Sequence, residues 1–218
     1  MQTLANVIRM PTPLALRGVA SAGMPQVLRK GEELFAEGDA ADWFYKVMAG
    51  AIRTSKLLSD GRRQIGAFHL AGEIFGLEAG EVHRFTAEAL AGATVLAFRR
   101  ACLELSAHDS EALREEVLAS AIRSLDRAQE HMLLLGRKTA QEKVAAFLLD
   151  MADRMPDGEG PFELPMSRSD IADYLGLTIE TVSRTLSQFT RDGLIRLPAA
   201  SRWIELCNLH ALRQLNVS

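Results

Sequence analysis

The sequence predicts an α+β protein with a β-rich N-terminal half, one long helix, and a C-terminal group of short helices and strands. Two features of the sequence support this prediction. Nine of the 16 glycines lie between Gly31 and Gly92, and proline is absent from residues 26–155. Frequent turns indicate short strands, whereas the later stretch without glycine, which ends at Gly136, indicates continuous helix.

The strands of the first half are predicted from turn signals between apolar runs. Residues 51–58 and 62–70 flank an Asp60-Gly61 pair, and Asp-Gly favours a hairpin because the turn needs positive φ angles. Residues 43–48 are rich in aromatic and β-branched side chains and predict another strand. Short strands at this spacing are typical of a sandwich or barrel.

The long helix is predicted from about residue 110 onward, where apolar side chains recur every three or four residues. This apolar stripe comprises Leu113, Val117, Ala121, Leu125, Ala128, Met132 and Leu135. A helix of roughly 26 residues is about 39 Å long, which is more than one helix of a small domain needs. We therefore expect a dimer interface along the stripe; the alternative is a helix that packs on its own sheet.

The C-terminal part has the signals of two helices joined by a tight turn. After a first helix opened by a Thr139/Glu142 capping box, residues 155–165 are expected to form a loop. Ser167 and Asp170 then have capping-box spacing, Gly176 permits a tight turn, Thr178 is suited to cap the next helix, and Gly193 is suited to end it. This pattern predicts a helix-turn-helix.

The second helix of this motif separates into two faces. Its apolar side chains are expected to be buried: Ile179, Val182, Leu186 and Phe189. The opposite face carries only polar side chains: Glu180, Ser183, Arg184 and Ser187. Arginine pairs with guanine, a carboxylate accepts from cytosine N4, and a hydroxyl bonds either donors or acceptors. We therefore expect Glu180, Ser183 and Arg184 to read base edges rather than to form an ordinary solvated face.

Charge constrains how this motif would hold DNA. The chain has 25 basic and 28 acidic residues, a net charge of −3, which argues against a non-specific nucleic-acid coat. Residues 194–197 and 202–206 predict a β-hairpin wing. Because the charge gives little general attraction for phosphates, contacts with the DNA backbone are expected to depend on a few individual side chains. The candidates are Arg168, Ser169, Thr178, Thr181 and Ser187.

With these residues in view, the chain resembles the CRP/FNR superfamily of bacterial transcription regulators, and most closely its FixK-like branch. Residues 57–70, 131–140 and 173–184 carry the most specific similarity. The resemblance implies an N-terminal cyclic-nucleotide-type β-roll (jelly-roll), a long dimerisation helix and a C-terminal winged helix-turn-helix. The expected boundaries are an N-terminal extension at 1–24, the roll at 25–108, the helix at 109–136 and the DNA-binding domain at 137–218.

The resemblance also implies a function. In this branch a Glu-x-x-Ser-Arg element reads inverted repeats such as TTGAT and ATCAA, and here Glu180, Ser183 and Arg184 match it. It implies a cytoplasmic homodimer that binds double-stranded promoter DNA, contacts RNA polymerase as an activator, and serves microaerobic respiration or nitrogen-fixation genes. No residue constellation suggests an enzyme, and no cofactor is expected.

The cysteines and histidines of this chain differ from those of metal-binding family members. Oxygen-sensing members hold an iron–sulfur cluster on four cysteines, but this chain has only Cys102 and Cys207. Both are expected to be small buried residues in a reducing compartment. Five histidines without ligand pairing predict no metal site.

The effector pocket of cyclic-AMP-binding members is matched only in part. Gly72, Glu73 and Arg84 are present, but Phe85 follows the arginine and the hydroxyl is displaced to Thr86. We expect a vestigial pocket in a regulator that acts without a small effector. The alternatives are a cyclic-nucleotide-gated regulator and, from another class, a nucleotide-sensing regulatory subunit of an enzyme.

No membrane segment is expected. The longest run without a charged residue, residues 18–28, has eleven residues, and a spanning helix needs about 20. The N-terminus also lacks the apolar run of a signal peptide.

Overall fold

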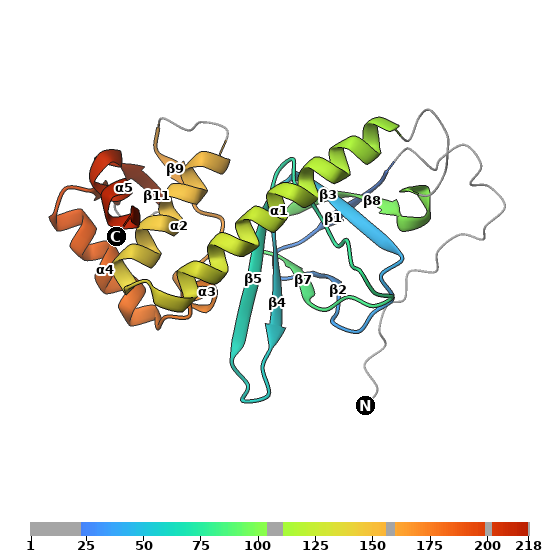
Figure 1. Ribbon diagram of the computed structural model, residues 1–218, viewed down its shortest axis with the longest axis horizontal. Helices are drawn as coiled ribbons and strands as arrows, with labels where there is room; N and C mark the ends of the chain where they lie inside the picture. Colours follow the sequence, from blue (N-terminus) through green and yellow to red (C-terminus); the bar gives the residue numbers. More distant parts are fainter. Residues whose placement is uncertain (1–22, 104–110, 156–159, 199–201, 218) are drawn as a thin grey trace.

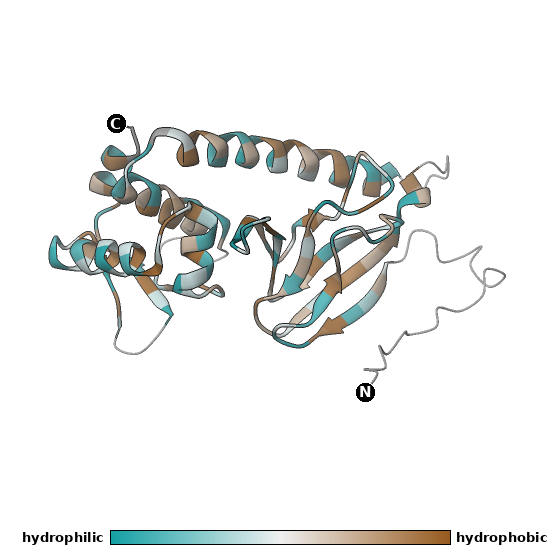
Figure 2. Ribbon diagram, turned by 90° about the horizontal axis from the view of Figure 1, so that it is seen from below, coloured by the Kyte–Doolittle hydropathy of each residue, from teal (hydrophilic) through white to brown (hydrophobic). Residues whose placement is uncertain are grey.

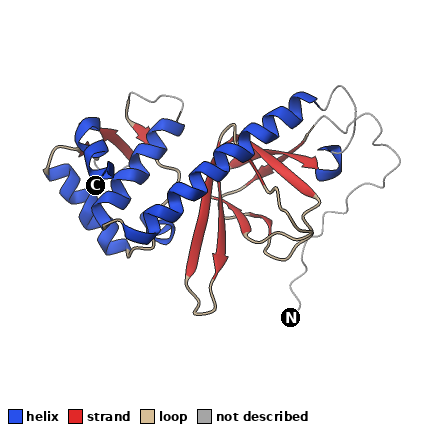
Figure 3. Ribbon diagram, viewed as in Figure 1, coloured by secondary structure: helices blue, strands red, loops and turns tan. Residues whose placement is uncertain are grey.

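The computed structural model describes residues 23–103, 111–155, 160–198 and 202–217. The predicted N-terminal extension falls outside these ranges except for its last two residues, and so does most of the predicted wing turn. The described chain has a β-rich half and a mainly helical half, and the long helix α1 runs past both (Figures 1 and 3). No described helix combines the length and apolar composition that crossing a membrane requires.

Two four-stranded antiparallel sheets form the β-rich half, here called the roll. Their strand orders are β1-β8-β3-β6 and β2-β7-β4-β5. The strands are β1 Met24–Leu28, β2 Glu33–Phe35, β3 Trp43–Ala49, β4 Ala51–Leu57, β5 Arg63–Leu70, β6 Ile74–Phe75, β7 Thr86–Ala89 and β8 Ala93–Arg99. Val47 and Val95 of one sheet and Ile52 of the other share one buried cluster. The predicted sandwich of short strands is confirmed.

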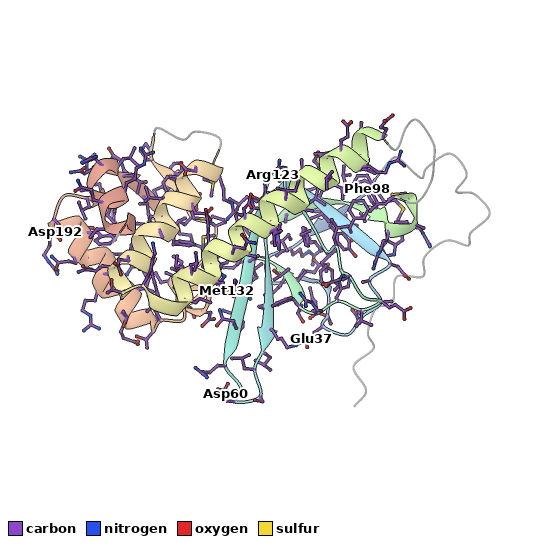
Figure 4. The ribbon with its side chains drawn as sticks, in the orientation of Figure 1. Glu37, Asp60, Phe98, Arg123, Met132 and Asp192 are labelled. Atoms are coloured by element: carbon purple, nitrogen blue, oxygen red, sulfur yellow. The ribbon has the colours of Figure 1, made fainter. Side chains whose placement is uncertain are left out.

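The hairpin of β4 and β5 is the predicted one, and Gly61 in its turn has a φ of 83°. A positive φ is strained for residues with a Cβ, so glycine suits this position. Asp60, whose position at the tip is labelled in Figure 4, accepts hydrogen bonds from the Arg62 backbone at 3.0 Å and from its guanidinium at 2.7 Å.

A β-bulge at Gly66 breaks the alternation of β5. Ile65 pairs with Ser55 and Phe68 pairs with Arg53, while Gly66 has no partner. Directly paired residues share a face of the sheet, and residues two apart on β4 do as well. Ile65 and Phe68 therefore point to the same side although they are three residues apart.

A 3-10 helix, Arg100–Leu103, and helix α1, Glu111–Arg137, follow the roll in the chain. The other half comes after them and is here called the head. Its helices are α2 Ala140–Arg154, α3 Arg168–Leu175, α4 Ile179–Arg191 and α5 Leu209–Val217. The three-stranded sheet β10-β11-β9 contains β9 Phe162–Glu163, β10 Ile195–Arg196 and β11 Trp203–Leu206. Thr139 and Ser167 complete the predicted capping boxes, and Gly176 has a φ of 61° in the predicted turn.

Three details of this half differ from expectation. Residues 155–165 were expected to be a loop only, but Phe162 pairs with Ile204 and adds a third strand beside the wing. Helix α5 was not predicted; it packs on α2, and its Leu212 is fully buried. Cys102 is buried as expected, whereas Cys207 is exposed because it lies just beyond the end of β11.

Helix α1 contacts its own chain along its whole length. Leu113 and Val117 pack on a roll cluster that includes Phe98. The buried Ser120 hydroxyl accepts a hydrogen bond from the Ile74 N–H at 3.3 Å. Near the other end, Leu134 belongs to the core of the head. One side of α1 is therefore covered by roll and head together (Figure 2).

Roll and head share an apolar cluster where they meet. The Phe68 ring of β5 lies 5.2 Å from the Tyr174 ring and 6.2 Å from the Phe147 ring, measured between centroids. Ile65 and Leu70 belong to the same buried cluster as the core of the head. The face that the bulge creates on β5 is thus the face that packs against the head.

Candidate nucleic-acid interface

Helix α4 is amphipathic, and its buried face packs into the head. Val182, Leu186 and Phe189 are buried as predicted, and Thr185 joins them. Ile179 differs from the prediction, since 43% of its surface is exposed at the first residue of the helix. The buried face fixes α4 against α2 and α3.

The opposite face of α4 carries the predicted base-reading residues Glu180, Ser183 and Arg184, and we call it the reading face. Glu180 and Arg184 are exposed, and Ser183 is half-buried between them. Among the residues that the structure describes, no hydrogen bond or ion pair engages the side chain of Glu180 or Arg184. The Ser187 hydroxyl donates to the Ser183 carbonyl at 2.9 Å. A carboxylate and a guanidinium are thus presented one helical turn apart, both available to an external partner.

The residues predicted to contact the DNA backbone lie at the starts of α3 and α4, except for Ser187, which lies farther along α4. Thr178 caps α4: its Oγ1 accepts from the Thr181 N–H at 3.2 Å and lies 3.0 Å from the Thr181 hydroxyl. Arg168 and Ser169 are exposed in the first turn of α3. The Arg168 Nη1 donates to the Ser183 hydroxyl at 3.4 Å. Helix N-termini point backbone N–H groups outward, which suits phosphate oxygens.

The wing lies next to this surface in the chain. Arg196 of β10 pairs with Glu205 of β11 at 2.5 Å, and Trp203 is 44% exposed. Figure 4 labels Asp192, the residue that ends α4, at the edge of the head that lies farthest from the roll. The carboxyl end of α4 therefore lies in the part of the head that is farthest from the roll.

The residues of the predicted effector pocket are engaged elsewhere. Glu73 Oε2 accepts from the Leu70 N–H at 3.1 Å, and Arg154 of α2 donates to both Glu73 oxygens at 3.0 Å. Arg84 has 77% of its side chain exposed and contacts Glu78 at 3.5 Å.

The other two residues expected in the vestigial pocket are Gly72 and Thr86. Gly72 has a φ of 90° in the turn before Glu73, and the Thr86 hydroxyl accepts from the Glu37 N–H at 3.0 Å. The structure therefore gives the glutamate and the arginine different partners. Sequence spacing missed Arg154, which lies 81 residues beyond Glu73 in the chain.

The predicted stripe of α1 divides between two sides of the helix. Leu113 and Val117 pack on the roll, and Leu135 is half-buried beside Gly176. Ala121, Leu125, Ala128 and Met132 are exposed, and Met132 is labelled on α1 in Figure 4. Two further exposed side chains, Leu118 at 63% and Ile122 at 54%, extend this apolar surface.

We call the exposed apolar surface of α1 the seam; it comprises Leu118, Ala121, Ile122, Leu125, Ala128 and Met132. Leu118, Ile122, Leu125 and Met132 follow steps of four, three and seven residues, which is heptad spacing. Leu125 and Met132 are 58% and 66% exposed. Most of the seam lies on a different side of α1 from Leu113 and Val117, which contact the roll, so the long helix has two apolar sides.

Comparison with known proteins identifies the family. The chain matches the cyclic nucleotide-binding domain over residues 25–105 and the Crp-like helix-turn-helix domain over residues 142–215. It is 46% identical over 187 residues to the nitrogen fixation regulation protein FixK of Rhizobium meliloti (strain 1021), covering 86% of this chain and 84% of that protein. The chain belongs to the CRP/FNR family, in its FixK-like branch.

Two further relatives support the FixK-like assignment. The structure of FixK2 from Bradyrhizobium japonicum superposes with a TM-score of 0.83 at 47% identity, covering 90% of this chain and 98% of that one. The transcriptional activator protein FnrA of Stutzerimonas stutzeri is 37% identical over 186 residues, which is 83% of this chain and 75% of FnrA. The predicted fold class is confirmed. This FixK-like chain is a transcription regulator with a helix-turn-helix DNA-binding domain and is not an enzyme.

Proposed function

We propose that this FixK-like regulator acts in the cytoplasm as a homodimeric activator. It binds a TTGAT-type inverted repeat in promoter DNA and recruits RNA polymerase, without a small effector. By kinship with proteins named for nitrogen fixation regulation, its genes serve microaerobic respiration or nitrogen fixation. The observation that carries the proposal is the outward presentation of Glu180, Ser183 and Arg184 on α4.

The chemistry of these three side chains fits the proposed site. Arg184 can donate to O6 and N7 of a guanine, and Glu180 can accept from the N4 amino group of a cytosine. A TTGAT half-site offers one guanine on one strand and one cytosine on the other. Ser183 can bond a neighbouring base edge, while Arg168, Ser169, Thr178, Thr181 and Ser187 would meet the backbone.

Dimerisation supplies affinity that one head lacks. From Ser167 to Arg202 the arginines outnumber the acidic residues by five to four, so the field that attracts phosphates is weak. The exposed seam of α1 fits a second copy of the same helix, because its heptad spacing is self-complementary. Two heads related by this twofold axis would present their α4 helices about 34 Å apart, one turn of B-DNA.

Independence from an effector is supported by the engagement of Glu73. Its Oε2 already accepts from Leu70 and Arg154 and its Oε1 from Arg154, so a ribose hydroxyl would have to compete with internal hydrogen bonds. Arg84 has no hydroxyl neighbour at residue 85 to complete a phosphate site. A nucleotide-gated regulator remains the competing hypothesis, which the following experiment addresses.

The test is a binding titration with full-length protein and labelled duplexes at fixed salt. The duplexes carry a TTGAT-type palindrome, the same palindrome with the guanine and cytosine exchanged, or a scrambled site, each with and without cyclic AMP. We expect the palindrome to bind about 10³-fold or more tightly than the scrambled site, with no effect of cyclic AMP. Equal affinities, or binding only with the nucleotide, would contradict the proposal.

A further inference from the structure

The roll holds the first helix of the helix-turn-helix through two arginines. Arg53 of β4 donates to Asp170 Oδ1 at 2.6 Å and to Glu88 of the roll at 2.7 Å. Arg63 of β5 donates to Asp170 Oδ1 at 2.9 Å and to Asp173 Oδ2 at 2.7 Å. Both acceptors in the head lie on α3, and both donors lie on the hairpin of the roll.

Asp170 uses its two carboxylate oxygens for different tasks. Oδ1 receives the arginines of the roll, while Oδ2 accepts from the Ser167 N–H at 2.9 Å and from its hydroxyl at 2.6 Å. The Asp170 side chain is only 7% exposed. The carboxylate that starts α3 is therefore also the one that fastens α3 to the roll. The next residue after Ser167 is Arg168, which reaches the reading face of α4.

Two further contacts lie along the same boundary. Arg154 of α2 donates to Glu73 of the roll at 3.0 Å and to the Phe68 carbonyl at 2.5 Å. Between this pair and the α3 ion pairs lies the apolar contact of Phe68 with Tyr174. Arginine–carboxylate ion pairs therefore lie on both sides of an apolar contact. This arrangement limits both sliding and rotation of the head against the roll.

The covalent connection alone does not fix this orientation. Helix α1 ends at Arg137 and helix α2 begins at Ala140, so only two residues separate them. No atom from elsewhere in the described chain lies within 4 Å of a Cβ built at Gly136. A short junction beside a glycine can rotate about its backbone dihedrals. The contacts that the roll and α1 make with the head, including the stacking of His131 of α1 on Tyr174 at 3.9 Å between centroids, then set the direction in which α4 points.

We propose that Arg53 and Arg63 are positioning residues for DNA recognition, which hold α3, and through it the reading face of α4, in the orientation that a palindromic site requires. The inference rests on the proposed function, since it describes how the same DNA site is presented. Neither arginine touches DNA. In this protein the roll serves as a brace for the head.

The energetic setting suits such a role. A partly buried ion pair contributes little net stability, because desolvation offsets its attraction. Removing one partner nevertheless leaves the other charge uncompensated against its neighbours. Loss of Arg63 would leave Asp173 without its guanidinium partner and would remove one of the two arginine contacts of Asp170. Because the Arg63 and Asp173 side chains are 30% and 28% exposed, water can solvate the freed carboxylate, so we expect overall stability to change little.

The test compares Arg63→Gln and Arg53→Gln with a matched control, Arg62→Gln, all in full-length protein. Arg62 lies beside Arg63 in the same hairpin, is 78% exposed and pairs with Asp60 of its own turn. Affinities for the TTGAT-type palindrome and for scrambled DNA are measured at one salt concentration. Hydrogen exchange of the α3 amides is followed in the free proteins.

We expect Arg63→Gln and Arg53→Gln to weaken binding to the palindrome by about 5- to 150-fold, the usual range of coupling between sites. Binding to scrambled DNA should change less than 2-fold, and α3 should exchange faster. Arg62→Gln should match the wild type in every measurement. The conservative variant Arg63→Lys, which keeps a positive charge beside both Asp170 and Asp173, should retain most of the affinity that Arg63→Gln loses.

The outcomes separate the two proposals. If the wild type does not prefer the palindrome, the proposed function fails, and the exchange rates of α3 still decide whether the arginines hold the head. If the wild type prefers the palindrome while Arg53→Gln and Arg63→Gln bind it equally well, the brace is wrong and the function stands. Tighter binding by these variants would also overturn the brace, because the contacts would then hold the head away from DNA.

Discussion

Arg168 and Ser183 meet across the helix-turn-helix, with the Arg168 Nη1 donating to the Ser183 hydroxyl at 3.4 Å. Arg168 is exposed at the start of α3, and Ser183 lies in the middle of the reading face of α4. The long, exposed contact is weak, so a DNA phosphate can replace the serine as the acceptor. The two predicted classes of DNA contact therefore begin from side chains that already touch.

Replacing Arg184 with alanine should weaken binding to the palindromic site by about 1–3 kcal/mol per contact and relax the preference for guanine at one position of each half-site. The physical reason is the loss of two directed N–H donors to one base. Competition binding with each of the four bases at that position measures the effect. A variant that keeps the wild-type base preference would show that Arg184 does not read the guanine.

Replacing Arg168 with alanine should weaken binding to every duplex by a similar factor, because a phosphate contact carries no base information. The slope of log affinity against log salt should decrease by about 1 per arginine. Titrations of palindromic and scrambled DNA at several salt concentrations measure both quantities. A loss confined to the palindrome would instead assign Arg168 to base reading through Ser183.

Replacing Ile122 with glutamate should convert the dimer to monomer, because the substitution places a charge in the seam of α1. Ile122 is 54% exposed in the single chain, so the substitution should leave the fold of the protomer intact. Sedimentation velocity at micromolar concentration measures the mass. Arg123→Ala is the matched control on the adjacent residue, also exposed, and it should remain dimeric. A monomeric wild type, or a dimeric Ile122→Glu, would remove the seam from the proposal.

Replacing His69 with glutamine should flatten the acid side of the stability profile. Burial first, and then the Arg154 and Arg127 charges, lower the pKa of His69 to about 3. The imidazole lies 3.1 Å from the Thr54 hydroxyl and stacks on Phe75. Because the unfolded chain takes up this proton near pH 6.5, the stabilising effect of neutral His69 is complete above that pH and is lost as the pH falls toward 3.

The expected size follows from the pH interval. Between pH 6.5 and 5 the wild type should lose about 2 kcal/mol more unfolding free energy than His69→Gln, at about 1.4 kcal/mol per pH unit. Burial also lowers the pKa of His83 and His131, but the wild type and His69→Gln both contain these two histidines, so their effect cancels in the comparison. Urea unfolding at the two pH values gives the comparison. Parallel profiles would show that His69 becomes protonated in the folded state.

The helix-turn-helix was predictable from sequence because its signals are local. The capping box of Ser167 and Asp170, the left-handed Gly176 and the Thr178 cap each act within four residues. The buried face of α4 followed from helical spacing, apart from Ile179. This residue is exposed because it begins the helix, where fewer neighbouring side chains cover it.

The sequence alone did not show which part of the predicted α1 stripe packs on the roll and which part is exposed. Four residues advance about 40° beyond one helical turn, so repeated steps of four carry the stripe around the helix. It begins on the side of the roll at Leu113 and Val117 and reaches the exposed side at Leu125 and Met132. A sequence with two apolar sides does not reveal which one meets the chain's own sheets.

Contacts between roll and head lay beyond sequence reasoning for a different reason. Strict alternation along β5 would place Ile65 and Phe68 on opposite faces, and only the unpaired Gly66 reverses this. The partners of Glu73, Arg53 and Arg63 come from residues 81, 117 and 110 positions away. Spacing within one segment carries no information about such partners.

The cluster of Phe68, Phe147 and Tyr174 has a consequence for engineering. The Phe68 ring of the roll packs on Phe147 and Tyr174 of the head, so the two halves share one apolar surface. A hybrid that grafts this head onto the β-domain of a distant relative would lose the contact of Phe68 with Phe147 and Tyr174 unless strand β5 came with it. Successful recombination of this regulator would therefore exchange β5 and α3 as a unit, with the crossover placed outside both.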